Sequence, residues 1–425
     1  MLPFPRVNLS PQIFMDDIAR MAANRDSAQY ANNLPETLIG NKSLQFNLEK
    51  SGFLVMGNKK ARHELHAQIE ESPLTLCEKT MKEVKVLKYL GDYLSFSLED
   101  SVHQTVTKRA AVARMAIYEI RTVIEDTRAD SLGALNLAFM FWEQSVLPML
   151  TFNCESWLGI QRKSVKVLDD LFHTFCRIIF RVSASCPILS FYWQSCSLKM
   201  ENLILERKLN FARHLANLPE GEIGRTVIDI QIDQNIGLFR EVKEHLTHLG
   251  IHNLQSVSKW QFRKTVKNYI FEKNKSELLS QIKGYKKLSY EELSRETFER
   301  KPYFFNLSLE NARMRFRVAS KLVPTVLMNF PSKYRRIGRP LTCPSCSRPS
   351  STPTSSSLTR ESAELNNSPD PLHSQTHIMT DCMAVSDLRA ECDPDDDTSL
   401  AVFFRKVVAR HMEMEDQLFD QLNLG

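Results

Sequence analysis

The chain has 425 residues, enough for two or three domains, of which 43% are hydrophobic and 25% charged. This balance is typical of a folded protein and excludes a chain that is disordered throughout. The net charge of +5 is too small to indicate nucleic-acid binding by itself, so the distribution of charge matters more. The first residues contain no apolar signal segment, which predicts an intracellular protein of the nucleus and cytoplasm.

Residues 1–100 mix short apolar runs with turn signals and predict the α+β part of the fold, short antiparallel strands with a helix. A short apolar run stops at the adjacent acids Asp16 and Asp17, as at a strand-to-turn junction. Residues 53–56 and 88–92 are further strand-like runs, and the second ends in a turn.

Residues 101–300 show the three- and four-residue spacing of amphipathic helices. One stripe predicts the buried face of a long helix: Val102, Val106, Ala110, Ala113, Ile117, Ile120 and Ile124. A second stripe predicts another: Val165, Leu168, Phe172, Phe175 and Ile179. Pro148 and Pro187 are expected near helix ends. The apolar stretch 132–150 contains polar residues, so we expect a buried helix there and no contact with a membrane.

Residues 301–346 form a basic stretch with interleaved aromatic residues. Such a stretch is often only a solvated face, but cations bind phosphates and aromatic rings stack on bases, so nucleic-acid binding is predicted. The candidate nucleic-acid-binding residues are Arg313, Arg317, Lys333, Arg335, Arg336 and Arg339. Residues 347–371, rich in serine, threonine and proline, are expected to be a disordered linker. The acids at 393–397 are expected to begin a final amphipathic helix.

A spaced group of cysteine and histidine residues, C-x2-C followed by H-x4-C, comprises Cys343, Cys346, His377 and Cys382. Three thiolates and one imidazole suit tetrahedral Zn²⁺, so residues 372–425 are expected to complete a zinc-knuckle-like cluster before a C-terminal helix. The alternative is a decayed cluster, since the two halves lie far apart, although loop-closure entropy grows slowly with length. Five lone cysteines are expected to be reduced core residues: Cys77, Cys154, Cys176, Cys186 and Cys196.

Adjacent aspartates at a hairpin can hold Mg²⁺, which prefers oxygen ligands, as in the two-metal nucleotidyl transfer of polymerases. An Asp-Asp pair alone is a weak signal, because chance and helix capping produce many such pairs. Here the pair ends the tetrad Phe14-Met15-Asp16-Asp17, and two further motifs follow it. One ends in Leu48-Glu49-Lys50-Ser51, and the other is Lys88-Tyr89-Leu90-Gly91-Asp92.

In this order the three motifs resemble those of reverse transcriptases from non-LTR retrotransposons, the jockey-like or related LINE elements. The resemblance implies that Asp16 and Asp17 are catalytic Mg²⁺ ligands and that Lys50 lies near the incoming triphosphate. It implies that Tyr89, Leu90 and Gly91 form a primer grip. Residues 1–100 would then be the last part of the polymerase palm, and residues 101–300 the helical thumb and connector. The partners would be an RNA template and a DNA primer or target, with the oligomeric state left open.

The family also needs fingers and a further metal-binding aspartate before the Asp-Asp hairpin, whereas the residues before Phe14 include no acid. The sequence therefore predicts a fragment of an RNA-directed DNA polymerase that is inactive as an isolated chain, because the metal site and substrate positioning are incomplete. Two alternatives stay open. One is a non-catalytic nucleic-acid-binding zinc-cluster protein derived from such an element, and the other is the product of a decayed reading frame.

Overall fold

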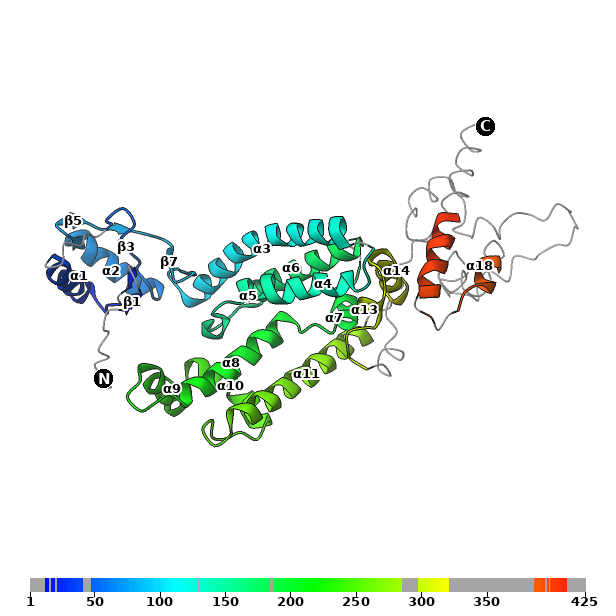
Figure 1. The fold of residues 1–425 in the computed structure, drawn as a ribbon. Coiled ribbons are helices and arrows are strands. Elements are labelled where there is room, and N and C mark those ends of the chain that lie inside the picture. Colours follow the sequence, from blue (N-terminus) through cyan, green and yellow to red (C-terminus); the bar gives the residue numbers. More distant parts are fainter. Residues whose placement is uncertain are drawn as a thin grey trace, which may run out of the picture. The chain divides into compact units, whose positions relative to one another are not determined.

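The computed structural model describes residues 12–14, 17–19, 21–40, 47–128, 130–183, 186–284, 297–320, 386–393, 396 and 398–410. Over these residues the fold is mainly α-helical with a few short two-stranded sheets (Figure 1). The chain divides into two compact units. Unit 1 comprises residues 1–114, 148–171 and 200–270, and unit 2 comprises residues 115–147, 172–199 and 271–425.

The strands of the described residues all lie in unit 1 and form separate pairs. Three pairs are antiparallel: β1 (Gln12–Phe14) with β2 (Asp17–Ala19), β4 (Thr75–Leu76) with β5 (Lys79–Thr80), and β7 (Leu87–Tyr89) with β8 (Asp92–Leu94). β3 (Gly52–Phe53) pairs in parallel with β6 (Lys82–Glu83), so the expectation of antiparallel strands is wrong for this pair. Parallel strands need a long crossover, and the residues between β3 and β6 supply it.

Cys77 is exposed, so its prediction as a core residue is wrong. It lies in the two-residue turn between β4 and β5, where φ is 49° at Cys77 and 61° at Glu78. A turn of this kind projects its side chains away from the strands it joins. Cys154, Cys176 and Cys186 are buried as expected, and Cys196 is half-buried.

Two helices accompany these strands, α1 (Arg25–Gly40) and α2 (Lys59–Glu71). The Gln29 side chain of α1 pairs with β4 as a neighbouring strand would. Its Oε1 accepts a hydrogen bond from the Thr75 amide at 2.8 Å, and its Nε2 donates to the Thr75 carbonyl at 3.1 Å. Because an open strand edge leaves such groups unpaired, these bonds satisfy the edge of β4.

The two predicted helical stripes are confirmed. Ser97 caps the first turn of α3 (Leu98–Arg128) by accepting a hydrogen bond from the Asp100 amide at 3.2 Å. All the residues of the first stripe are buried on α3. α6 (Arg162–Phe180) buries the second stripe except Val165, which is half-buried.

Between these helices, α4 (Ala134–Phe141) continues through a π-helical turn, Trp142–Val146, into α5 (Leu147–Leu150). Pro148 lies two residues before this helical run ends at Leu150, so its prediction near a helix end is confirmed. Proline has no amide hydrogen to donate to the preceding turn, and the π turn lies directly before it, where the Leu147 amide bonds to the Trp142 carbonyl five residues back. Pro187 is the N-cap of α7 (Ile188–Ser195), also as predicted.

The remaining helices complete the two units. They are η2 (Cys154–Ser156), α8 (Met200–Ala216), α9 (Ile223–Gln234), α10 (Gly237–His248), α11 (Lys259–Lys283), α13 (Tyr303–Asn306), α14 (Leu309–Ala319) and α18 (Ser386–Ala390). None of the helices in the described part of the chain has the length and apolar composition that a membrane crossing requires.

Aromatic rings form the core of unit 2. The Phe139 ring of α4 lies 5.1 Å from Phe175 and 5.2 Å from Phe304, edge-on to both, and Trp142 stacks on Phe175 at 4.9 Å. Such pairs contribute roughly 0.5–1.5 kcal/mol each beyond the burial of their area. The cluster therefore fixes how α4, α13 and the second part of α6 pack in unit 2.

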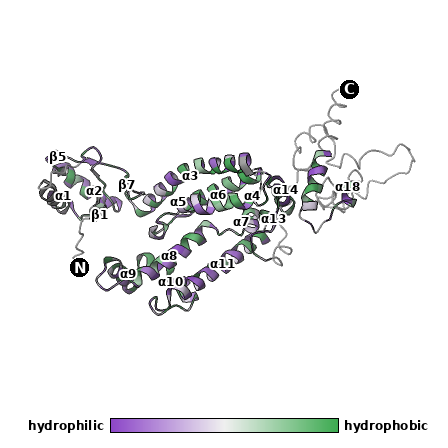
Figure 2. Cartoon of the chain, in the orientation of Figure 1, coloured by the Kyte–Doolittle hydropathy of each residue, from purple (hydrophilic) through white to green (hydrophobic). Residues whose placement is uncertain are grey.

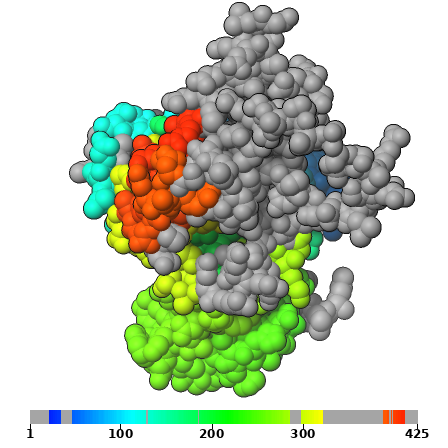
Figure 3. Space-filling model, turned by 90° about the vertical axis from the view of Figure 1, so that its right-hand side faces the viewer, coloured from blue at the N-terminus to red at the C-terminus, as the bar shows by residue number. Residues whose placement is uncertain are grey.

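Residues 398–410 are helical, as the acidic run before them predicts. The Asp396 carboxylate accepts a hydrogen bond from the Ser399 amide at 2.6 Å, which caps the helix. Leu400, Phe403 and Phe404 are buried. Orange to red atoms in Figure 3 mark the described residues from 386 to 410.

Candidate nucleic-acid interface

The hairpin of β7 and β8 carries the predicted primer-grip residues at its tip. Tyr89 pairs with Asp92, which leaves Leu90 and Gly91 as a two-residue turn with φ values of 46° and 85°. A turn with positive φ at both positions matches the twist of the flanking strands. Leucine is an unusual residue there, since this conformation costs a residue with a Cβ roughly 1–2 kcal/mol. Surrounding contacts must therefore hold the tip in place.

Arg109 of α3 supplies those contacts. Its Nη2 donates to the Gly91 carbonyl at 2.9 Å and to Asp92 Oδ1 at 2.8 Å, and its Nη1 donates to the Phe152 carbonyl at 2.5 Å. One buried guanidinium thus joins the hairpin to α3 and to the loop after α5, all within unit 1. Burial lowers the pKa of Arg109, and Asp92 opposes that shift.

Two further hydrogen bonds fix the first residues of β8. Asn153 Nδ2 donates to Asp92 Oδ2 at 2.6 Å, and the Tyr93 amide donates to the Thr105 hydroxyl at 2.8 Å. Both oxygens of the Asp92 carboxylate therefore have partners, as a mostly buried charge requires. Contacts from α3 and from the loop after α5 therefore hold the hairpin, and its tip has a defined position.

The surface at this tip is apolar and lies beside cations. Leu90 is 42% exposed and Phe152 57% exposed, and the Arg109 guanidinium lies 5.4 Å from the Phe152 ring. Lys88 is exposed on β7, and Lys85 is exposed two residues before this strand. An apolar tip next to cations suits the sugar and base edge of a strand whose phosphates meet the lysines.

No protein-family model, curated protein or solved structure matches the chain.

The backbone near the predicted catalytic acids forms the expected hairpin. β1 and β2 are antiparallel, and Phe14 pairs with Asp17 across them. Met15 and Asp16 lie outside the described residues. Lys50 is exposed in a turn, where its amide donates to the Asn47 carbonyl at 3.2 Å.

Arg313 is not available to bind phosphate, so its prediction as a nucleic-acid-binding residue is wrong. Its side chain is 1% exposed, and all of its guanidinium nitrogens have partners within unit 2. Nη2 donates to Glu125 at 2.7 Å, Nη1 to Glu310 at 2.5 Å, and Nε to the Ile179 carbonyl at 2.6 Å. Arg317 is half-buried on the same helix, and its Nη2 donates to the Arg181 carbonyl at 2.8 Å.

The other predicted binding and zinc residues lie outside the described residues: Lys333, Arg335, Arg336, Arg339, Cys343, Cys346, His377 and Cys382. The linker predicted at 347–371 lies outside them too. Among the residues that the structure does describe, no three potential metal ligands gather.

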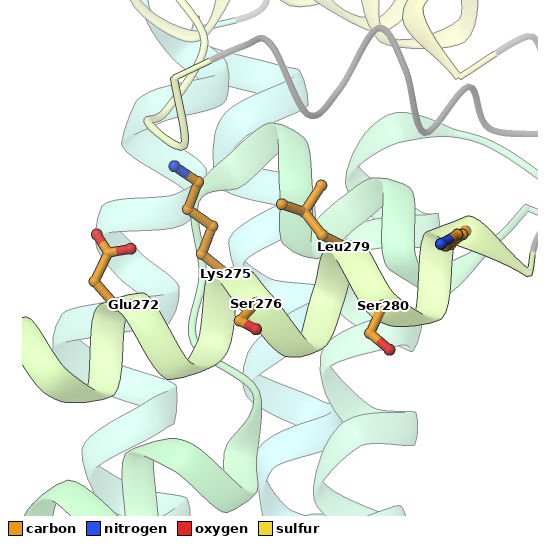
Figure 4. A pocket seen from close by; sticks show the side chains of 6 residues that line it. Glu272, Lys275, Ser276, Leu279 and Ser280 are labelled. Atoms are coloured by element: carbon orange, nitrogen blue, oxygen red, sulfur yellow. The ribbon is translucent and has the colours of Figure 1, made fainter. Parts of the chain in front are cut away.

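A surface pocket lies along the second part of α11 (Figure 4). Its lining residues are Glu272, Lys275, Ser276, Leu279, Ser280 and Lys283. They all come from one helix, whereas small-molecule sites surround a ligand with polar groups that converge. We therefore assign no ligand to this pocket.

Two residues of the interface, Arg109 and Phe152, were not among the predicted site residues. Arg109 lies three residues after Val106, on the helix face that the apolar stripe buries. A cation on a buried face needs a carboxylate partner, so its position alone could have indicated an anchoring role. Phe152 carries no comparable sequence signal, because its role depends on its contact with a distant helix.

Proposed function

We propose that this chain is the nucleic-acid-holding part of a reverse transcriptase of the non-LTR retrotransposon type. In this proposal, the β7–β8 hairpin holds the end of a primer strand. The observation that carries it is the strained Leu90-Gly91 tip, which Arg109 and Asp92 fix against α3. The order of the Asp-Asp, Lys50 and Tyr89-Leu90-Gly91 motifs supports the same reading.

The two acids at the first hairpin are the proposed ligands of Mg²⁺. The antiparallel pairing of Phe14 with Asp17 supports this assignment, because it places the backbone of Asp17 at the end of two short strands. Asp16 and Asp17 would hold the ion, which when bound supplies charge stabilisation for nucleotidyl transfer. Lys50, exposed in its turn, would add positive charge for a triphosphate. Cys343, Cys346, His377 and Cys382 are the proposed zinc ligands.

The primer-grip proposal is tested by a charge change at the tip. Leu90→Asp and Leu90→Asn have the same shape, and both residue types tolerate positive φ, so both variants should fold. Only the aspartate repels a phosphate backbone. We expect Leu90→Asp to bind a duplex with a recessed 3′ end about tenfold more weakly than Leu90→Asn in fluorescence anisotropy. Equal affinities for the two variants would show that the hairpin tip does not contact the nucleic acid.

Primer extension with Mg²⁺ separates a polymerase from a protein that only binds. For the isolated chain we expect binding without extension. If extension occurs, the double change Asp16→Asn, Asp17→Asn must abolish it, while Tyr118→Leu, at an exposed site of α3, serves as the folded control. Extension that survives the double change would contradict the assignment of the acids.

A further inference from the structure

Trp260, at the start of α11, is an exposed indole in a protein whose other tryptophans are buried. Its side chain is 69% exposed, whereas Trp142, Trp157 and Trp193 are at most 3% exposed. An indole buries a large apolar area when it finds a partner, so exposure of most of the ring is costly. Exposed aromatic rings next to cations are common features of binding surfaces.

Three cations follow this indole on the same side of α11. Arg263, Lys264 and Lys267 follow Trp260 by three, four and seven residues, a spacing that places all of them on one side of the helix. All of these residues are exposed, and the Lys264 Nζ lies 5.0 Å from the Trp260 ring centroid. Hydrophilic positions recur along α11 in Figure 2. We call these four residues the Trp260 face.

The positive charge of the Trp260 face is largely uncompensated. Residues 245–271 contain no aspartate or glutamate. The ion pairs between described residues in this part of unit 1 do not involve Arg263 or Lys264. Burial raises the pKa of Glu206 on α8, and the positive charge of Lys267 opposes that rise. Lys267 is therefore partly compensated by this carboxyl group. Arg263 and Lys264 remain as cations directed at solvent.

The start of α11, which carries this face, is held in place by a helix cap and by contacts with α8. The Ser258 hydroxyl donates to Gln261 Oε1 at 2.9 Å and accepts from the Gln261 amide at 3.3 Å, which caps the first turn. Arg213 of α8 donates to the Val257 carbonyl at 2.8 Å, and its guanidinium lies 5.7 Å from the Phe262 ring. The Trp260 face is therefore a preformed surface of unit 1.

We propose that the Trp260 face binds single-stranded nucleic acid, with an unpaired base stacked on the indole and the adjacent phosphates bound by Arg263, Lys264 and Lys267. Stacking on a tryptophan requires a base that is free of its own stack, which favours a single strand over a duplex. The cations match a polyanion of regular charge. An acidic peptide would use the cations but leave the indole without a flat partner. This site is separate from the proposed primer grip and does not depend on it.

The fluorescence of Trp260 itself tests this proposal. Titration of the full chain with an unlabelled thymidine oligonucleotide at low salt should quench the exposed component of tryptophan emission in a saturable way. Trp260→Leu should abolish that change and weaken binding of the labelled oligonucleotide by about tenfold or more in anisotropy. Arg263→Gln with Lys264→Gln should weaken binding and reduce its salt dependence by about one unit of slope per lost contact.

Three controls decide between outcomes. Tyr118→Leu removes an exposed aromatic residue of α3 and should bind as the wild type does. Leu90→Asp should retain the quenching, which separates this site from the primer grip. Circular dichroism checks that Trp260→Leu folds. Equal oligonucleotide binding by wild type and Trp260→Leu would overturn the proposal. Equal or stronger quenching by polyglutamate or by phosphatidylserine vesicles would also overturn it, in favour of a peptide or membrane surface.

Discussion

Glu125, on α3, lies at the centre of an arginine cluster in unit 2. Its carboxylate accepts hydrogen bonds from Arg121, Arg181 and Arg313, and its side chain is 15% exposed. Burial disfavours its charged form, but the hydrogen bonds from the three arginines outweigh burial and lower the pKa of Glu125 to about 2. The charged carboxylate is therefore bound more favourably in the folded protein than in the unfolded chain.

This shift predicts a pH-dependent contribution to stability. A carboxyl group with a depressed folded pKa stabilises the protein above its unfolded pKa of 4.5 and loses that effect as pH falls towards about 2. At pH 6 we expect Glu125→Gln to reduce the free energy of unfolding by about 2 kcal/mol, a difference that shrinks between pH 4.5 and 2. Urea unfolding across this range measures it. Glu119→Gln, at an exposed position of the same helix, is the control. A difference that stays constant with pH would refute the prediction.

The Arg109–Asp92 pair supports a second prediction at this scale. Arg109→Met leaves the Asp92 carboxylate buried without its cation, so the free energy of unfolding should fall by about 3 kcal/mol. Adding Asp92→Asn should restore part of this loss, because the neutral amide can remain buried. A double-mutant cycle by urea denaturation gives the coupling energy, with Arg114→Met at an exposed site of α3 as the matched control. Additive effects of the two changes would exclude the coupling.

Arg109 and Arg313 also show where prediction from residue type ends. Both are arginines in basic sequence segments, yet the structure buries both and pairs them with carboxylates. Asp92 lies close to Arg109 in sequence, but Glu125 is far from Arg313 along the chain. A charge count along the sequence cannot reveal such a partner, whereas it correctly describes Arg263 and Lys264 as exposed cations.

Among the elements, helices with long apolar stripes could be predicted from the sequence, whereas the pairing of short strands and the irregular turn within a helix could not. Every position of the stripe from Val102 to Ile124 is buried on α3, because four- and three-residue spacing dictates a single face. The hairpin at residues 88–92 was likewise predictable from its turn. The parallel pairing of β3 with β6 and the π turn before Pro148 depend on contacts or geometry that periodicity does not encode.

Gly133, the N-cap of α4, gives a prediction at the element scale. Its φ is 74°, and an added Cβ would lie 3.1 Å from the Phe305 carbonyl oxygen at α13. Gly250 has a similar φ of 66° but open space around it. Gly250→Ala should lower the free energy of unfolding by about 1 kcal/mol, which is the cost of a positive φ at alanine. Gly133→Ala should lower it by about 1–2 kcal/mol more, because α13 must also move slightly away from α4. Thermal unfolding of the two variants measures the difference, and equal losses of stability would show that α13 moves without cost.

At the scale of the whole molecule, the two units are each assembled from segments that are distant in sequence. Sequence boundaries such as 101–300 describe changes in composition and pattern, and they carry no information on which distant segments pack together. The mainly helical character was predictable because it depends on local spacing. The aromatic core that joins Phe139, Phe175 and Phe304 was not, because each ring comes from a different helix.

The zinc assignment is a prediction for the complete chain. We expect the purified protein to carry about one Zn²⁺ per chain, held by three thiolates and one imidazole. Cys343→Ser with Cys346→Ser should remove the metal, and Cys392→Ser, a half-buried cysteine outside the proposed ligands, should keep it. Elemental analysis after dialysis without chelator measures the content. Wild-type protein free of zinc, or zinc retained by the double variant, would contradict the assignment.

The π turn at Trp142–Val146 holds one residue more than an ordinary helical turn, because the Leu147 amide bonds to the Trp142 carbonyl five residues back. Deleting one residue there would convert the turn to ordinary helical bonding, and the side chains on either side would keep their faces. Leu150 would therefore stay buried. A one-residue deletion within α4 would instead rotate every later side chain by about 100°. Homologues of this protein should therefore differ in length by one residue at this turn more readily than within α4.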